Sequence, residues 1–247
     1  MNLYKADLHT HTVLSPCGDL DMSPVNIVRR AKEKRIDILG ITDHNSTKNC
    51  KALNDIAENN DLMILKGAEV TTKEEVHCLA FFENDDELSE FQKYLDNHLP
   101  EIENDINKFG YQVVVDRDEN IIEQENWLLI SALNANINQI EKKIHELKGL
   151  FIPAHIDKMR YSILSQLGFV PSDLRIDALE ISKFVKKNEF LKQNQYLADY
   201  CFIQSSDAHY IENIGDTATY FQMKEKSFSE IRYALKSEKG RKVIVDE

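Results

Sequence analysis

The sequence predicts an α/β protein in which about seven short parallel strands, with helices between them, form a closed β/α barrel. Two observations support this prediction. Short apolar runs alternate with helix-like segments along most of the chain, which is typical of strands joined by crossover helices. Six of the eight histidines lie at or near the ends of these runs, and functional groups of such barrels lie at strand ends. We expect a single domain over residues 1–247, with one buried core.

The first third of the chain alternates strands with helices. Ser23 and Pro24 mark a helix start, because serine is a favoured N-cap and proline suits the first helical position. We expect strands at 3–8, 36–42, 62–65, 68–71 and 76–82, and helices at 23–35 and 46–58.

Residues 84–147 differ from the rest, because they are polar and rich in Asn, Glu and Asp. Helices are expected at 86–97, 100–109 and 136–147. We interpret this stretch as a helical insertion on the barrel. It either packs against the barrel wall or forms a lid over the site, as long insertions sometimes do.

From residue 150 the alternation resumes. Strands are expected at 151–154, 178–181, 202–204 and 217–221, and helices at 161–168 and 187–199. The segment Ser227–Glu230 has the pattern of a capping box and predicts the start of the final helix.

Composition excludes several classes of protein. The net charge of −12 disfavours long nucleic acid and anionic membranes as partners. No apolar stretch approaches the ~20 residues of a membrane span, and no signal peptide is visible, so we expect a cytoplasmic protein. The four cysteines form no CxxC pair and are expected to be reduced; Cys17 lies beside the proposed site. The oligomeric state stays open.

The motifs at the strand ends predict a metal centre. His9 and His11 are two residues apart on an extended segment, which places both rings on one face, and Asp7 could orient one of them. Glu69 lies within an apolar strand, where a carboxylate is costly unless it is paired or bound to metal. Histidine is the commonest neutral metal ligand. Each motif alone is weak evidence, but together they indicate one polynuclear metal centre.

The chain resembles the PHP (polymerase and histidinol phosphatase) family of metal-dependent phosphoesterases. The motifs that carry the resemblance are DLHTHT at 7–12, GITDHN at 40–45, GAE at 67–69, His77, PAH at 153–155 and SSDAH at 205–209. The resemblance implies a distorted (β/α)7 barrel with two or three divalent metal ions.

The resemblance also implies three groups of ligands. These are His9, His11, Glu69 and Asp207 for one metal; Glu69, His77 and His155 for a second; and Asp19, His44 and His209 for a third. Ser15-Pro16-Cys17-Gly18 precedes Asp19, so Cys17 could take its role. Such a mixed shell suits Mn, Fe or Zn without choosing among them.

The mechanism expected from this shell is attack by a metal-bridged hydroxide on a phosphoryl group, with the two metals ~3.5–4 Å apart. The residues expected to act in catalysis are Glu69, Asp207 and His209. Those expected to bind the substrate phosphate are Lys183, Lys158 and Arg160, each of which follows a predicted strand end. His98 and His145 are expected to be structural.

The predicted function is hydrolysis of a small phosphomonoester, either a nucleotide or a sugar phosphate. One alternative is a phosphodiesterase or exonuclease that acts on short oligonucleotides. Two further alternatives are a metallo-hydrolase that cleaves a bond other than a phosphoester, and a regulatory binding module, since the same family contributes modules to DNA polymerases.

Overall fold

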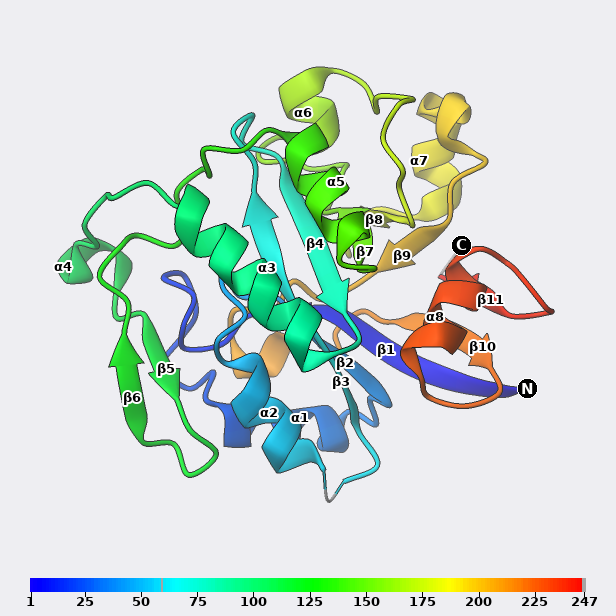
Figure 1. Ribbon diagram of the computed structural model, residues 1–247. Helices are drawn as coiled ribbons and strands as arrows, with labels where there is room; N and C mark the ends of the chain where they lie inside the picture. The colour runs from blue at the N-terminus through cyan, green and yellow to red at the C-terminus, as the bar shows by residue number, and fades with distance from the viewer. Residues whose placement is uncertain (59, 246–247) are drawn as a thin grey trace.

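The computed structural model describes residues 1–58 and 60–245 and shows a curled sheet surrounded by helices (Figure 1). The main sheet has seven strands. In spatial order they are β11 (Lys242–Ile244), β10 (Thr219–Met223), β1 (Asn2–Thr10), β2 (Ile38–Ile41), β3 (Met63–Thr71), β4 (His77–Phe82) and β7 (Leu150–Pro153). Strand β3 replaces the two separate strands that were expected at 62–65 and 68–71.

The strands of this sheet are not all parallel, contrary to the prediction. Strands β1, β2 and β3 pair in parallel, but β4 runs antiparallel to both β3 and β7. The physical reason is the length of the connection. Only residues 72–76 separate β3 from β4, and a parallel crossover needs about a dozen residues or more.

A second, two-stranded sheet completes the barrel wall. It pairs β8 (Leu179–Ile181) with β9 (Phe202–Gln204) in parallel. Hydrogen bonds from Ile156 N to the Glu180 carbonyl, and from Gln204 N to the Thr219 hydroxyl, connect it to the main sheet. One buried cluster takes side chains from both sheets, including Leu8, Leu79 and Ile203. The structure therefore confirms the α/β barrel class.

Helices cover the outer side of the sheet. Their bounds are α1 Pro24–Glu33, α2 Cys50–Ala57, α3 Asp85–His98, α5 Ile137–Glu146, α6 Ile163–Leu167, α7 Lys187–Gln193 and α8 Phe228–Leu235, with short 3-10 turns at Gln195–Leu197 and Ile211–Asn213. Leu88, Phe91 and Leu95 place α3 in the core against β4. Among the described residues, no helix is both long enough and apolar enough to cross a membrane.

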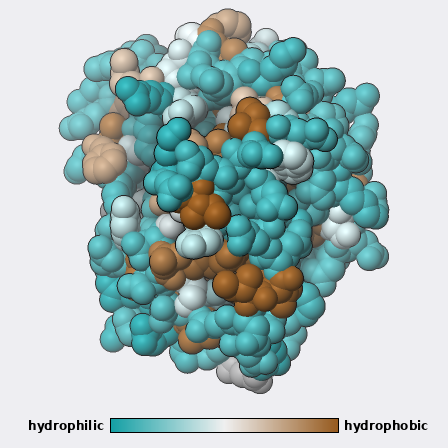
Figure 2. Space-filling model, turned by 90° about the vertical axis from the view of Figure 1, so that its left-hand side faces the viewer, coloured by the Kyte–Doolittle hydropathy of each residue, from teal (hydrophilic) through white to brown (hydrophobic). Residues whose placement is uncertain are grey.

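The stretch 84–147 is only partly helical. Its two long helices, α3 and α5, pack on β4 and β7. The expected helix at 100–109 shrinks to α4 (Ile106–Phe109), and a hairpin of β5 (Val113–Val115) and β6 (Ile121–Gln124) follows. Strand β6 is exposed along its whole length, and apolar patches interrupt the hydrophilic surface on this side of the molecule (Figure 2). The run of valines had marked a strand that the prediction of helices passed over.

Candidate metal centre

All of the predicted ligands except Asp19 meet at one rim of the barrel. His9 lies in β1 with His11 just beyond it, His44 follows β2, and Glu69 lies in β3, paired with His44 by an isolated bridge. His77 begins β4. Because β4 runs antiparallel to β3, its first residue reaches the rim at which β3 ends.

Five imidazole rings surround the carboxylate of Glu69, which is 1% exposed. The distances from ring nitrogen to carboxylate oxygen are 3.3 Å for His9 Nε2, 3.4 Å for His11 Nε2, 3.1 Å for His44 Nδ1, 2.8 Å for His77 Nδ1 and 3.1 Å for His155 Nε2. Burial by itself raises the pKa of Glu69, but His77, His9 and His44 outweigh it and hold that pKa well below its usual range. Glu69 is therefore an anion at the centre of the cluster.

This arrangement fits divalent metal ions. A carboxylate offers about four lone-pair positions, and His77 and His155 lie within hydrogen-bond distance of Glu69 Oε1. His9 Nε2 and His11 Nε2 also face each other at 3.3 Å. In the part of the chain that the structure describes, His44 Nδ1 is buried without a hydrogen-bond partner. Nitrogen lone pairs that converge in this way on an anion suit cations placed among them.

Glu180 orients His9 and was missed by the sequence prediction. Its Oε2 lies 3.0 Å from His9 Nδ1 and accepts a hydrogen bond of 3.0 Å from the His155 backbone N–H. When His9 donates from Nδ1, its Nε2 is left bare and faces Glu69. A signal was present in the sequence, because Glu180, like Glu69, is a carboxylate within an apolar strand.

Asp43 orients His11 through Ser15. The Ser15 hydroxyl donates to Asp43 Oδ1 over 2.7 Å and lies 2.9 Å from His11 Nδ1. Donation from His11 Nδ1 to this hydroxyl leaves Nε2 free for a metal. Asp7 does not orient an imidazole. Its carboxylate instead accepts backbone N–H bonds from Ser206 and Gly215, which hold the loop after β9 against β1.

Asp207 completes one side of the cluster. Its Oδ1 lies 3.4 Å from His9 Nε2 and 3.6 Å from His11 Nε2, and its Oδ2 accepts a hydrogen bond from Lys158. The backbone of Asp207 has a φ of 52° and that of His155 a φ of 30°. Strained conformations of residues other than glycine cluster at functional sites, which agrees with a ligand role for both side chains.

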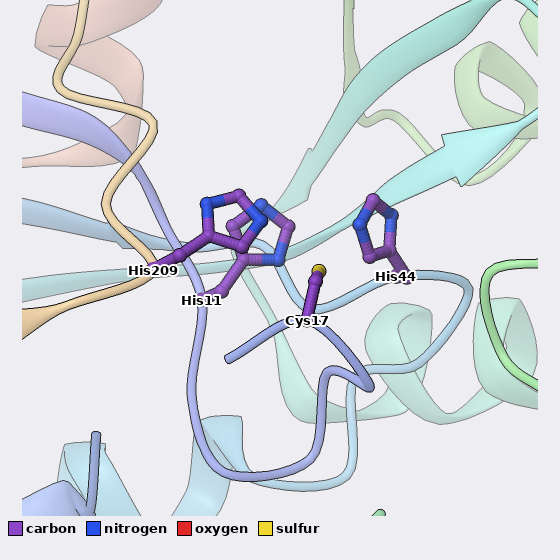
Figure 3. A group of neighbouring side chains, drawn as sticks. All are labelled: His11, Cys17, His44 and His209. Carbon is purple, nitrogen blue, oxygen red and sulfur yellow. The ribbon is translucent and has the colours of Figure 1, made fainter. Parts of the chain in front are cut away.

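A third group forms beside Glu69. One ligand atom from each of His11, Cys17, His44 and His209 lies within 4.8 Å of the others, and Figure 3 shows the Cys17 sulfur directed between the rings. Asp19 is not part of this group. Its Oδ1 accepts the Asp21 backbone N–H over 2.8 Å within its own turn.

The electrostatics of this group differ from those around Glu69. Burial lowers the pKa of His44 well below its usual range and lowers the pKa of His209 to about 4. Both rings are therefore neutral near pH 7, which is the form that binds metal. Burial, together with Glu69 and Asp207, raises the pKa of the Cys17 thiol. A bound cation has the opposite effect, because it lowers the pKa of a thiol that coordinates it.

A cavity of about 560 Å³ opens above the centre. Its wall includes Lys158 and Arg160 together with Tyr161, Phe184 and Ile130; a substrate-binding role of the first two stays a prediction. Lys183 lines a smaller neighbouring cavity instead, and its Nζ lies 3.6 Å from Asp216 Oδ2.

Comparisons with known proteins place this geometry in a family. The PHP domain family model matches residues 7–213. The uncharacterized protein YqxK of Bacillus subtilis is 30% identical over 135 residues, which cover 49% of this chain and 35% of that protein. The uncharacterized protein MJ1587 of Methanocaldococcus jannaschii is 32% identical over 90 residues, which cover 33% of this chain and 52% of that protein. The matched stretches thus span about a third and a half of these relatives.

Solved structures share the fold. A lesion-specific endonuclease, endonuclease Q from Pyrococcus furiosus, superposes with a TM-score of 0.73 at 21% identity, covering 98% of this chain and 58% of that one. A two-domain protein from Bacteroides vulgatus, described as containing a predicted PHP-like metal-dependent phosphoesterase, gives 0.57 at 18% identity, with coverages of 99% and 65%. Because the family match extends over most of the sequence and includes the histidine motifs of the rim, the chain belongs to the PHP domain family.

Proposed function

We propose that this chain is a metal-dependent phosphoesterase that hydrolyses a small phosphomonoester, either a nucleotide or a sugar phosphate. The observation that carries the proposal is the buried cage of histidines around Glu69, which opens into a cavity containing Lys158 and Arg160. The donor set suits Mn, Fe or Zn, and two or three ions would occupy the three ligand groups.

The chain's own residues have distinct parts in this proposal. His9, His11, Glu69 and Asp207 would hold one metal ion and Glu69, His77 and His155 a second. When bound at these residues, metal ions would lower the pKa of water and neutralise charge on the phosphoryl group. Glu180 and Asp43 keep the rings of His9 and His11 directed inward. Because these groups are fixed before substrate arrives, no reorganisation is needed during the reaction.

Lys158 and Arg160 are proposed to bind the phosphate. Lys158 pairs with Asp207 and is half-buried, whereas Arg160 is exposed on the cavity wall. An arginine fork matches phosphate oxygens in pairs, while lysine acts as a point charge. Lys183 serves less directly, since it is paired with Asp216.

A nucleotide fits this cavity better than a sugar phosphate. The volume of about 560 Å³ falls within the range of ligand pockets, about 300–1,000 Å³. Tyr161 and Phe184 line the wall and are 41% and 79% exposed, so flat apolar surface is available for a base. Ile130, from the stretch 84–147, also lines the wall. This favours the lid alternative for the part of the stretch around Ile130, whereas α3 and α5 pack on the sheet.

A phosphodiesterase is the second candidate. It is favoured by the structural likeness to endonuclease Q, which covers 98% of this chain. The net charge of −12 opposes long duplexes but not a few nucleotides. The structural match covers 58% of that endonuclease.

The test is hydrolysis by metal-loaded protein, followed as phosphate release from sugar phosphates and nucleoside monophosphates and as strand cleavage of short oligonucleotides and lesion-containing duplexes. A chelated sample is the control. We expect metal-dependent release from nucleoside monophosphates and its loss in His9→Ala and Asp207→Ala, with both variants still folded. Undiminished turnover by both variants would refute the proposed centre, and cleavage of oligonucleotides alone would favour the phosphodiesterase.

A further inference from the structure

We propose that Cys17 is a metal ligand, and that with His44 and His209 it forms a thiolate-containing position that selects a thiophilic divalent cation such as Zn²⁺. The inference rests on the metal centre of the proposed function but not on its phosphoester chemistry. It assigns to the cysteine the role that the family resemblance had given to Asp19.

The first argument is convergence. The four candidate ligands come from different parts of the barrel, namely the loop after β1, the end of β2 and the segment after β9. Their ligand atoms nevertheless lie within 4.8 Å of one another. Figure 3 shows the thiol of Cys17 between the rings of His11 and His44, with His209 stacked on His11.

The second argument concerns which nitrogens are available. His11 uses Nδ1 towards Ser15 and turns Nε2 towards Glu69 and Asp207, so it serves the neighbouring metal position. One imidazole nitrogen binds one metal. Cys17, His44 and His209 then remain as three protein ligands with an open fourth position, which is typical of catalytic rather than structural zinc.

The third argument is that both remaining histidines have an uncommitted nitrogen. His209 Nδ1 lies 3.0 Å from the carbonyl oxygen of Asp207, and donation there leaves Nε2 bare. His44 is 3% exposed, and its Nδ1 lies 3.1 Å from Glu69 Oε2 but forms no hydrogen bond within the described ranges 1–58 and 60–245. A buried nitrogen without a partner is costly unless a ligand satisfies it.

The fourth argument is that the backbone fixes the cysteine. The Asp19 backbone N–H donates to the His209 carbonyl over 2.9 Å, so the cysteine loop and the His209 segment are tied together. Gly18 is required beside it, because a Cβ at this position would lie 2.4 Å from the Thr12 carbonyl oxygen. The same turn uses the Asp19 carboxylate for its own Asp21 N–H, which leaves the thiol as the donor directed at the rings.

The chemical consequence is selectivity. Thiolates are soft ligands that favour zinc or iron, whereas carboxylates and imidazoles accept manganese as well. Cys17 lines the cavity, so a cation can reach it from solvent. The centre would then combine two carboxylate and imidazole positions with one sulfur-containing position.

The test is cobalt substitution followed by absorption spectroscopy. Cobalt(II) bound to a thiolate gives a sulfur-to-metal charge-transfer band in the near ultraviolet, and this readout does not depend on catalysis. We expect the band in the natural protein and in the control Cys201→Ser, whose half-buried thiol lies in another cavity. In Cys17→Ser the band should disappear and one metal ion should be lost. A band that persists in Cys17→Ser would overturn the proposal.

A second measurement needs no variant. Zinc should protect Cys17 of the natural protein from alkylation, as followed by peptide mass spectrometry, while leaving the modification of Cys201 unchanged. Equal alkylation of Cys17 with and without zinc would contradict the assignment. If the charge-transfer band is present but no phosphoester is cleaved, the proposed function fails and the cysteine ligand stands. If phosphate is released but the band is absent, the cysteine ligand fails and the proposed function stands.

Discussion

The five histidines around Glu69 and the single His145 of α5 differ in how their ring nitrogens are matched by carboxylates. At the rim, the rings of five histidines approach the one carboxylate of Glu69, and two of them, His9 and His11, also lie near Glu180 or Asp207. On the outer face, His145 of α5 has one carboxylate for each ring nitrogen, with Glu141 Oε1 at 2.5 Å from Nδ1 and Asp177 Oδ2 at 3.1 Å from Nε2. Arg175 adds a second cation at 2.9 Å from Glu141.

The difference separates a metal centre from an ion-pair clamp, the name used here for His145 with Glu141 and Asp177. A ring with a carboxylate at each nitrogen is satisfied as an imidazolium, and needs nothing further. Five rings that converge on Glu69, with Glu180 and Asp207 near only two of them, leave several ring nitrogens without a carboxylate of their own, which suits added cations. The ratio of ring nitrogens to carboxylates therefore indicates the role of a buried histidine better than burial does.

The largest effect is expected for Glu69→Gln. Loss of an outer partner of a metal ligand already costs about 10–100-fold in affinity or activity, so loss of the shared carboxylate should lower phosphate release more than 100-fold and remove bound metal. Metal analysis alongside the activity assay checks this. His145→Gln is the control and should retain metal; the comparison breaks if both variants lose metal to the same extent.

A smaller effect is expected for Glu180→Gln. The amide cannot provide the negative charge that favours donation from His9 Nδ1, so metal affinity should fall about 10–100-fold while the fold is kept. Competition with a coloured chelator measures the affinity. Glu141→Gln, which alters the outer clamp, should leave affinity unchanged. An unaltered affinity in Glu180→Gln would show that His9 is oriented without this carboxylate.

The clamp makes a prediction about pH. Burial lowers the pKa of His145, but Asp177 and Glu141 outweigh it and raise that pKa above 6.5. The stabilisation is therefore full below about pH 6.5 and is lost as the pH rises through the folded-state pKa. His145→Gln should lower the free energy of unfolding by about 1–3 kcal/mol at acidic pH, with a difference that shrinks at alkaline pH. Urea unfolding across that range measures it, and a constant difference would contradict the clamp.

The smallest effect is expected for Asn136→Ala, in the same helix. Asn136 caps α5 in a reciprocal box with Gln139, and removal of such a cap costs about 1 kcal/mol. This loss should be the same at every pH, since no charge is involved. A pH-dependent loss in Asn136→Ala would mean that the helix as a whole, not His145, carries the pH response.

Local pattern was sufficient to predict most strands of this fold, but not their directions. The apolar run from His77 to Phe82 predicts a strand whichever neighbour it pairs with. Its antiparallel direction depends on the short connection after Thr71, a constraint that the alternating rhythm of the first strands obscured. The hairpin at Val113–Gln124 was missed for a related reason, because polar composition was weighted above a β-branched run.

The candidate site likewise divides into residues that local patterns predict and residues that depend on distant contacts. Residues within motifs, such as His9 and His155, were found because spacing and strand ends are local signals. Glu180 was missed because its partner His9 lies 171 residues away. Asp19 was placed with the third group by resemblance, with Cys17 as its alternative, and the turn geometry that separates the two becomes visible only in three dimensions.

The most direct test of the metal centre is the metal content of the reconstituted natural protein, measured by mass spectrometry after removal of free ions, beside Glu69→Gln and His145→Gln. The rim geometry predicts two or three ions per chain in the natural protein and in His145→Gln, and their loss in Glu69→Gln. A natural protein that retains no ion, or a Glu69→Gln variant that retains them all, would contradict the assignment of this rim as a metal centre.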